Sequence, residues 1–209
     1  MRQDDGSFIV FEGIDGAGTT TQSARFARYL RQHRRVVHTT REPSDGPVGH
    51  LLRLALGGRV DLGPAHTMAL LFAADRLDHV NQEIRPHLRD GSVVICDRYD
   101  LSSIAYQTAT APAEERESFE SWVRELNRYA VRPDVTVILH VDPAEAEKRR
   151  ANRQGAPELF EESQLQKDLA TLYRDAERLR PGDTFVHIDG NQTADEVEQA
   201  IRGAVEPIL

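Results

Sequence analysis

At 209 residues, the chain has room for one α/β domain but not for a second domain of full size. Apolar residues make up 39% and charged residues 29%, a globular balance that excludes a largely disordered or low-complexity chain. The net charge of −8 argues against a broad nucleic-acid-binding face, which needs clustered Lys and Arg, but it allows small phosphorylated ligands in a local basic pocket.

Five short β-rich runs occur along the chain, at residues 8–11, 36–39, 93–96, 135–139 and 184–188. The runs are mostly apolar and are separated by stretches long enough for a helix, which is typical of parallel strands covered on both faces. Right-handed connections would then place helices on both sides of the sheet. The sequence therefore predicts a three-layer α/β/α fold with a five-stranded parallel sheet.

Helix signals fill the intervening stretches, because apolar residues recur there at helical spacing. We expect helices at residues 20–31, 64–84, 102–108, 113–129, from Asp142-Pro143 onward, at 164–179 and at 194–205. Pro86 should end the second of these helices, and residues 154–157 should form a mobile loop. Since no linker divides these elements, we expect residues 1–209 to form a single domain.

The segment between the first strand and the first helix is rich in glycine. Its residues are Gly13, Ile14, Asp15, Gly16, Ala17, Gly18, Thr19 and Thr20. Glycines let backbone N–H groups point inward, and the helix start adds partial positive charge, so the segment is suited to bind the phosphates of ATP. It departs from the consensus G-x-x-x-x-G-K-[ST] in having Thr19 for lysine, whereas Thr20 keeps the hydroxyl expected on Mg²⁺. A glycine-rich turn with no ligand is the alternative.

Further motifs continue along the chain. Together with the glycine-rich segment they comprise residues 8–18, 20–22, 40–43, 70–76, 96–99, 101–107 and 132–134. In this order they resemble the bacterial thymidylate kinase family. The resemblance implies a P-loop NTPase-type nucleoside monophosphate kinase with a lid at about residues 149–162, which transfers a phosphoryl group from Mg²⁺-bound ATP to dTMP and gives dTDP and ADP. It also implies a homodimer. Thr19 is the main departure from the family and bears on catalytic strength more than on identity.

Phe72 and Arg76 lie four residues apart and therefore share a face of the helix expected at 64–84. A thymine site needs an aromatic platform beside a hydrogen-bond donor. The resemblance implies that Phe72 stacks on the base and that Arg76 contacts its edge. Core packing alone explains Phe72 about as well, whereas an arginine on the same face is hard to place in a core.

Asp97 and Arg98 follow the third strand, and ligands of open parallel sheets bind outside the carboxyl ends of strands. Asp97 can serve Mg²⁺ through water, and Arg98 can bridge the acceptor phosphate and the transferred group. A solvent-facing ion pair is the alternative.

The family segment that holds the thymine edge is matched by Ser102, Ser103, Tyr106 and Gln107. Its tyrosine is implied to press against the sugar and to exclude a ribose hydroxyl, while a plain helix start capped by Ser102 is the alternative. Asp15 would repel a phosphate, so the resemblance implies that it accepts a hydrogen bond from the sugar hydroxyl. Glu42 and Pro43 would fix the loop beneath the sugar, and Arg53 is a lesser candidate for the acceptor phosphate.

Arg149 and Arg153 share a face of the predicted helix, and Arg150 is three residues from Arg153. Members of the family place arginines in this lid, and closing it over ATP would supply the positive charge that Thr19 lacks. A solvated basic helix end is the alternative. The catalytic candidates are Asp15, Arg98, Arg149 and Arg153. The family segment that flanks adenine is matched by Asn191 and Gln192, which on spacing alone form a turn.

Two other functions compete with a kinase. A weakly active or inactive nucleotide-binding regulator of the same fold is supported by Thr19 alone. A P-loop GTPase or ATPase switch would need a guanine-selecting Asn-Lys-x-Asp segment or a water-positioning glutamine, and the sequence offers no such segment. The single cysteine, Cys96, allows no internal disulfide, and no apolar run approaches the ~20 residues that span a bilayer. Since the N-terminus also lacks a secretion signal, we expect a cytoplasmic protein with no membrane partner.

Overall fold

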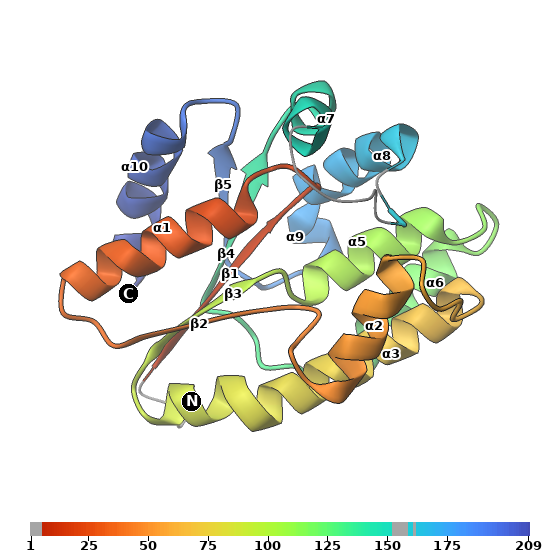
Figure 1. Cartoon of the computed structure of the whole chain (residues 1–209), viewed down its shortest axis with the longest axis horizontal. Helices are drawn as coiled ribbons and strands as arrows, with labels where there is room; N and C mark the ends of the chain where they lie inside the picture. Colours follow the sequence, from red (N-terminus) through yellow and green to blue (C-terminus); the bar gives the residue numbers. More distant parts are fainter. Residues whose placement is uncertain (1–5, 152–158, 161) are drawn as a thin grey trace.

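The computed structural model describes residues 6–151, 159–160 and 162–209 (Figure 1). Within these ranges, five parallel strands form one sheet in the order β2-β3-β1-β4-β5. The strands are β1 Ser7–Gly13, β2 Val37–Arg41, β3 Val93–Asp97, β4 Val135–His140 and β5 Phe185–Asp189. The expected α/β fold with a five-stranded parallel sheet is confirmed.

Helices cover both faces of the sheet. They are α1 Thr19–Gln32, α2 Pro47–Leu56, α3 Ala65–His79, α4 Arg85–Arg89, α5 Asp100–Thr110, α6 Arg116–Leu126, α7 Pro143–Ala151, α8 Ser163–Arg174, α9 Ala176–Leu179 and α10 Ala194–Val205. Helices α1 and α10 lie side by side against one face, whereas α4, α5 and α8 contact strands from the other (Figure 1). Within the described ranges, no helix has both the length and the apolar composition needed to cross a bilayer.

Alternating side chains of β1 pack against the helices on the two faces of the sheet. Ile9 and Phe11 belong to the apolar cluster that contains Phe26 of α1. Phe8 and Val10 point to the opposite face, as expected for a strand, and belong to a second cluster that extends to α4. Because β1 is buried on both faces, its sequence reads as a continuous apolar run, and this made the strand easy to predict.

Strand register brings the carboxyl ends of three strands to one edge of the sheet. Asp97, the last residue of β3, lies opposite Phe11 on one side and Arg41, the last residue of β2, on the other. Gly13, the last residue of β1, lies opposite Leu139 of β4. The glycine-rich segment after β1 and the residues after β3 therefore meet at this edge, where ligands of open α/β sheets bind.

The expectation that Pro86 ends the long helix is wrong. A π-helical turn, Val80–Ile84, follows α3, and Pro86 lies in the first turn of α4, which continues to Arg89. Proline has no N–H to donate and its ring clashes with the carbonyl one turn earlier in a regular helix. The wider π turn immediately before it changes that local bonding pattern, so the chain keeps a helical course through the proline.

Two other features of the helices differ from the expectation. Helix α2 was not predicted, although Gly46 and Pro47 at its start are typical of a helix N-terminus. The single helix expected at 164–179 is divided at Asp175 into α8 and α9. The start and end expected for α10 agree with the structure, and a capping box of Thr193 and Glu196 fixes its start.

Candidate active site

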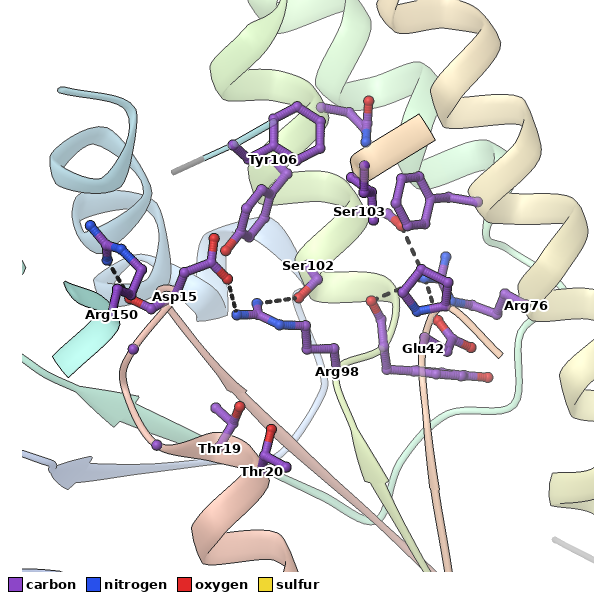
Figure 2. Close-up of a pocket in the computed structure, with 18 of the residues that line it drawn as sticks. Asp15, Thr19, Thr20, Glu42, Arg76, Arg98, Ser102, Ser103, Tyr106 and Arg150 are labelled. Atoms are coloured by element: carbon purple, nitrogen blue, oxygen red, sulfur yellow. Dashed lines mark hydrogen bonds and ion pairs between the residues drawn. The ribbon is translucent and has the colours of Figure 1, made fainter. Parts of the chain in front are cut away.

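A pocket of about 440 Å³ lies at the carboxyl edge of the sheet. The predicted site residues that line it are Asp15, Gly16, Gly18, Thr19, Thr20, Glu42, Pro43, Phe72, Arg76, Arg98, Ser102, Ser103, Tyr106, Gln107 and Arg149. Arg150, one of the three arginines considered for the lid, lines it as well, and so do residues that the sequence had not assigned to the site, among them Leu56 and Phe160. Figure 2 places Asp15, Thr19 and Arg150 at one end, here called the phosphate-loop end, and Glu42 and Arg76 at the other, here called the α3 end.

The backbone of the phosphate loop requires glycine at two positions. Gly16 and Gly18 have φ angles of +88° and +94°, a region that side chains other than glycine rarely adopt. Helix α1 begins directly after Gly18 with no side-chain cap and no acidic residue in its first turn. The N–H groups of that turn are therefore available to an anion, and the partial positive charge of the helix start favours one.

Thr20 and Asp97 come together at the base of this loop. The hydroxyl of Thr20 donates to Oδ2 of Asp97 at 2.5 Å, and Oδ1 of Asp97 is buried without a partner among the described residues. Hydroxyl and carboxylate oxygens are the ligands that Mg²⁺ prefers. The described residues contain no cluster of three or more acidic, histidine or cysteine side chains suited to a metal. The Thr20–Asp97 pair therefore fits an ion that keeps several waters and binds phosphate oxygens as well.

Arg98 turns from the end of β3 into the pocket. Its φ of 71° is unusual for a residue other than glycine and directs its side chain toward the loop. One guanidinium nitrogen donates to the main-chain oxygen of Gly13 at 2.9 Å and another pairs with Asp15 at 2.6 Å (Figure 2). Burial lowers the pKa of Arg98, but the phenol of Tyr106 and the Asp15 carboxylate outweigh it, so the pKa lies above the ordinary value. Arg98 thus carries a permanent charge at the pocket wall rather than on the solvent-facing surface.

Glu12 is a buried acid beneath Arg98 that the sequence analysis missed. It accepts hydrogen bonds from the backbone N–H of Tyr99, from the N–H and hydroxyl of Ser102, and from the hydroxyl of Tyr173. Burial raises its pKa to about 7, although Arg98 and the donors from Tyr99 and Ser102 act in the opposite direction. A glutamate directly after the apolar run at residues 8–11 of β1 was the available signal.

The hydrogen bond from Ser102 to Glu12 shows that Ser102 does not cap α5. The residue before the first turn of α5 is Tyr99, and no side chain caps it. Ser102 lies inside the helix, and its hydroxyl donates to Glu12 at 2.5 Å. The alternative in which Ser102 is a plain helix cap is therefore wrong.

Gln166 of α8 is a second residue that the sequence analysis missed. Its side-chain amide donates to Oδ2 of Asp15 at 2.9 Å and to the main-chain oxygen of Phe160 at 2.7 Å. Its carbonyl oxygen accepts from the backbone N–H of Asp15 at 3.0 Å. Gln166 is fully buried, so it fixes Asp15 against α8. Nothing in its local sequence signalled this contact, because the partners are far apart along the chain.

Arg76 is buried at the α3 end, with its side chain only 1% exposed. Its guanidinium pairs with Glu42 at 2.6 Å and donates to Asn127, to the main-chain oxygen of Tyr99 and to the hydroxyl of Ser103. Such burial is possible because an opposite charge and neutral oxygens replace water around the guanidinium. Nε of Arg76 has no partner among the described residues.

Aromatic rings form the wall between the two ends. Phe72 lines the pocket and also packs on the apolar cluster that contains Leu52 of α2, so it contributes to both the core and the wall. The rings of Tyr106 and Phe160 meet edge to face with centroids 5.6 Å apart. The hydroxyl of Tyr106 and the amide oxygen of Gln107 are buried without a partner among the described residues. These polar atoms are therefore available to a ligand.

Some predicted site residues do not line the pocket. Arg53 donates to the main-chain oxygens of Pro43 and Ser44, so it holds the loop after β2 instead of facing the pocket. Asn191 and Gln192 are exposed in the turn after β5, next to Asp189. Gly13, Ile14 and Ala17 of the phosphate loop are not among the lining residues of the pocket, and neither is Asp97. Arg153 lies outside the described residues.

Comparison with known proteins identifies the family of the chain. The chain matches the family model described as thymidylate kinase over residues 11–201. It is 40% identical to a probable thymidylate kinase of Pyrobaculum calidifontis over 95% of both chains. It is 38% identical to a thymidylate kinase of Bifidobacterium longum subsp. infantis, over 98% of this chain and 88% of the relative. A probable thymidylate kinase of Thermococcus gammatolerans is 36% identical over 96% of both chains. The chain therefore belongs to the thymidylate kinase family, a family of nucleoside monophosphate kinases.

Proposed function

We propose that the protein transfers the γ-phosphoryl group of ATP to dTMP, giving dTDP and ADP, by direct in-line attack without a covalent intermediate. One observation carries this proposal: a single pocket has a glycine-rich phosphate loop at one end and a buried arginine beside an aromatic wall at the other. Arg98 lies between the two ends (Figure 2). Such a pocket can hold two nucleotides with their phosphates facing, and positioning then supplies much of the catalysis.

Thr20 and Asp97 would hold Mg²⁺, since their oxygens meet at the base of the loop. The bound ion would bridge phosphate oxygens of ATP and offset their negative charge. The buried Oδ1 of Asp97, which has no partner among the described residues, supports this assignment. We expect a chelator such as EDTA to abolish turnover and excess Mg²⁺ to restore it.

At the α3 end we assign the base of dTMP to the wall that Phe72 and Arg76 form. Phe72 would stack on the thymine. Nε of Arg76, which has no partner in the part of the chain that the structure describes, supports a polar contact with the base edge. Further contacts to the edge would come from Ser102, Ser103 and Gln107. Glu42 and Pro43 would fix the wall beneath the sugar, and Tyr106 would pack against the sugar and disfavour a ribose hydroxyl.

At the phosphate-loop end, Arg98 would bridge the acceptor phosphate of dTMP and the transferred group, where a guanidinium can bind two oxygens at once. Asp15 would accept from the sugar hydroxyl, because a carboxylate has capacity beyond its present partners Arg98 and Gln166. Arg149 would contact ATP, and Asn191 and Gln192 would flank its adenine. The position of Arg53 gives no support for a role at the acceptor phosphate.

A coupled ADP-release assay across dTMP, dUMP, dCMP, AMP and ribothymidine monophosphate tests this function. We expect the highest kcat/KM with dTMP and a marked loss with the ribonucleotide. Binding of dTMP without turnover would instead support an inactive regulator, the alternative that rests on Thr19 alone. Slow ATP hydrolysis that dTMP does not change would support a nucleotide switch. A homodimer and a cytoplasmic location remain predictions.

A further inference from the structure

Behind the Arg76–Glu42 pair lies a third ionisable side chain, His79, which the proposed function leaves without a role. His79 is the last residue of α3 and follows Arg76 by three residues, so the two share a face of the helix. Its side chain is 0% exposed and is not among those that line the pocket. A polar group buried to this extent needs hydrogen-bond partners inside the protein.

Thr40 of β2 and Glu42, which follows β2, contact the two ring nitrogens of His79. Nδ1 lies 3.2 Å from Oε1 of Glu42, and Nε2 lies 2.7 Å from the hydroxyl oxygen of Thr40. An ionised carboxylate only accepts hydrogen bonds, so Nδ1 carries a proton and donates to Glu42. Burial lowers the pKa of this histidine, but the hydrogen bond to Glu42 and the charges of Glu42, Glu83 and Asp75 outweigh it, so the pKa lies above its ordinary value.

Glu42 connects His79 to Arg76. Its Oε1 accepts from His79, and its Oε2 accepts from the guanidinium of Arg76 at 2.6 Å. The terminal torsion of a glutamate is soft, so a donor on one oxygen decides where the other oxygen lies. Figure 2 shows Glu42 and Arg76 together in the wall of the pocket. The hydrogen bond from His79 to Glu42 therefore sets the orientation in which Arg76 meets a ligand.

We propose that His79 is a positioning residue for base recognition: by holding Oε1 of Glu42, it keeps the guanidinium of Arg76 in the orientation that meets the base edge. The inference rests on the proposed function, because it deepens the role assigned to Arg76. Thymine presents a carbonyl oxygen at the position where cytosine presents an amino group. A guanidinium has donors and no acceptor, so in a fixed orientation it bonds the carbonyl oxygen and opposes the amino group. His79 thereby contributes to the preference for dTMP over dCMP.

The variants His79→Asn and His79→Gln separate the two hydrogen bonds of the histidine. The amide nitrogen of asparagine can lie where Nδ1 lies, and that of glutamine where Nε2 lies, because the side chains have matching lengths. His79→Asn therefore keeps a donor for Glu42 and loses the contact with Thr40, whereas His79→Gln does the reverse. The control pair is His33→Asn and His33→Gln at the exposed end of α1, where Nδ1 donates to the main-chain oxygen of Tyr29 at 2.9 Å.

Calorimetry gives the Kd for thymidine, which lacks a phosphate and so reports on the part of the pocket that binds base and sugar. The coupled assay gives kcat and KM for dTMP and dCMP. We expect His79→Gln to raise the Kd for thymidine and the KM for dTMP about tenfold, the scale of one hydrogen bond, and to leave kcat within about threefold of wild type. The ratio of kcat/KM for dTMP to that for dCMP should fall about tenfold. His79→Asn should stay within about threefold of wild type in every measurement, and the His33 variants within about twofold.

An unchanged Kd for thymidine in His79→Gln would overturn the inference. A loss in His79→Asn that equals or exceeds the loss in His79→Gln would also overturn it, because the contact with Glu42 would then not be the one that matters. So would an equal loss for dTMP and dCMP, since a pocket that is merely less ordered does not change the preference between the two bases.

Urea denaturation verifies that each variant is folded. If neither His79 variant folds, the ¹⁵N resonances of the His79 ring are followed in the wild type, where thymidine should shift them because the base and His79 act on the same Arg76–Glu42 pair. Unchanged resonances would overturn the inference. If the wild type binds thymidine without phosphorylating dTMP, the proposed function fails, and calorimetry on the two variants still decides the role of His79.

Discussion

The two ends of the pocket hold their arginines by different means. At the α3 end, the side chain of Arg76 is 1% exposed and faces Glu42, which is 3% exposed, at 2.6 Å. At the phosphate-loop end, Arg98 and Arg149 are 21% and 33% exposed, and main-chain oxygens are among their acceptors. A buried charge needs a partner inside the protein, whereas a half-exposed one can exchange its acceptor for a ligand.

This difference matches the two kinds of ligand group proposed for the pocket. A thymine base is neutral, so a cation beside it must find its counter-charge in the protein, as Arg76 does in Glu42. Phosphates bring their own negative charge, so the cations around them need no full set of acidic partners. We infer that the α3 end is formed before a ligand arrives, which reduces the cost of ordering it on binding. The phosphate-loop end completes its hydrogen bonds with the nucleotide.

The largest effect should come from removing the charge that lies between the two ends. Arg98→Ala is expected to lower kcat about a thousandfold, because an arginine that bridges transferring phosphates is worth orders of magnitude in phosphoryl transfer. The KM for ATP should change far less. Steady-state kinetics with dTMP and ATP measures both. The control is Arg128→Ala, an exposed arginine that pairs with Glu125 away from the pocket.

If Arg98→Ala lost less than about tenfold in kcat, the bridging role would be refuted and Arg98 would be only a structural partner of Asp15. Arg98→Lys sharpens the result, since it keeps the charge but loses the planar fork. We expect it to recover part of the rate and not all of it.

The second effect concerns the stability of the α3 end. Glu42→Gln leaves Arg76 buried without an opposite charge, which is expected to lower the free energy of unfolding by about 3 kcal/mol. Urea denaturation followed by circular dichroism measures the change. Replacing both residues, with Arg76→Met added, should recover much of that loss, because neither charge is then left alone.

Asp45→Asn is the matched control for Glu42→Gln. Asp45 lies in the loop after β2 and also pairs with arginine, but its side chain is 75% exposed. A surface pair of this kind contributes at most about 1 kcal/mol, so the variant should unfold near wild type. Equal losses in the two variants would contradict the view that burial makes the Arg76–Glu42 pair costly to break.

Much of the fold could be predicted because its signals are local. Apolar runs such as that of β1 mark strands buried on both faces, and Gly16 and Gly18 mark backbone angles that other residues avoid. The π turn before Pro86 could not be predicted, because it depends on how the bonding pattern of one helix adapts to a single proline. The helix propensities of the individual residues do not predict that change.

The candidate site divides in the same way. Side chains at strand ends, such as Asp97 and Arg98, could be placed at one edge of the sheet from the sequence, because parallel strands end there together. Glu12 and Gln166 could not, since their partners lie as far away in sequence as Tyr173 and Asp15. The burial of Arg76 was likewise hidden, because it depends on Glu42 from a different strand end.

The smallest effect should come from Glu12, the buried acid beneath Arg98, and it depends on pH. Its pKa is about 7 in the folded protein against 4.5 for an ordinary glutamate. The folded state therefore binds this proton more tightly than the unfolded chain does, so the stability that the group contributes is full below 4.5 and is lost as pH rises through 7.

We compare wild type with Glu12→Gln by urea denaturation at pH 5, 6, 7 and 8, with the exposed Glu125→Gln as the control. The free energy of unfolding of wild type should fall relative to Glu12→Gln by about 2 kcal/mol between pH 5 and pH 7 and change little above that. Glu125→Gln should keep a constant offset. Parallel pH profiles for wild type and Glu12→Gln would mean that the four donors and Arg98 outweigh burial and keep Glu12 ionised. Its carboxylate would then resemble the buried, paired charges of the α3 end and not the half-exposed charges beside the phosphate loop, which can exchange their acceptors for a ligand.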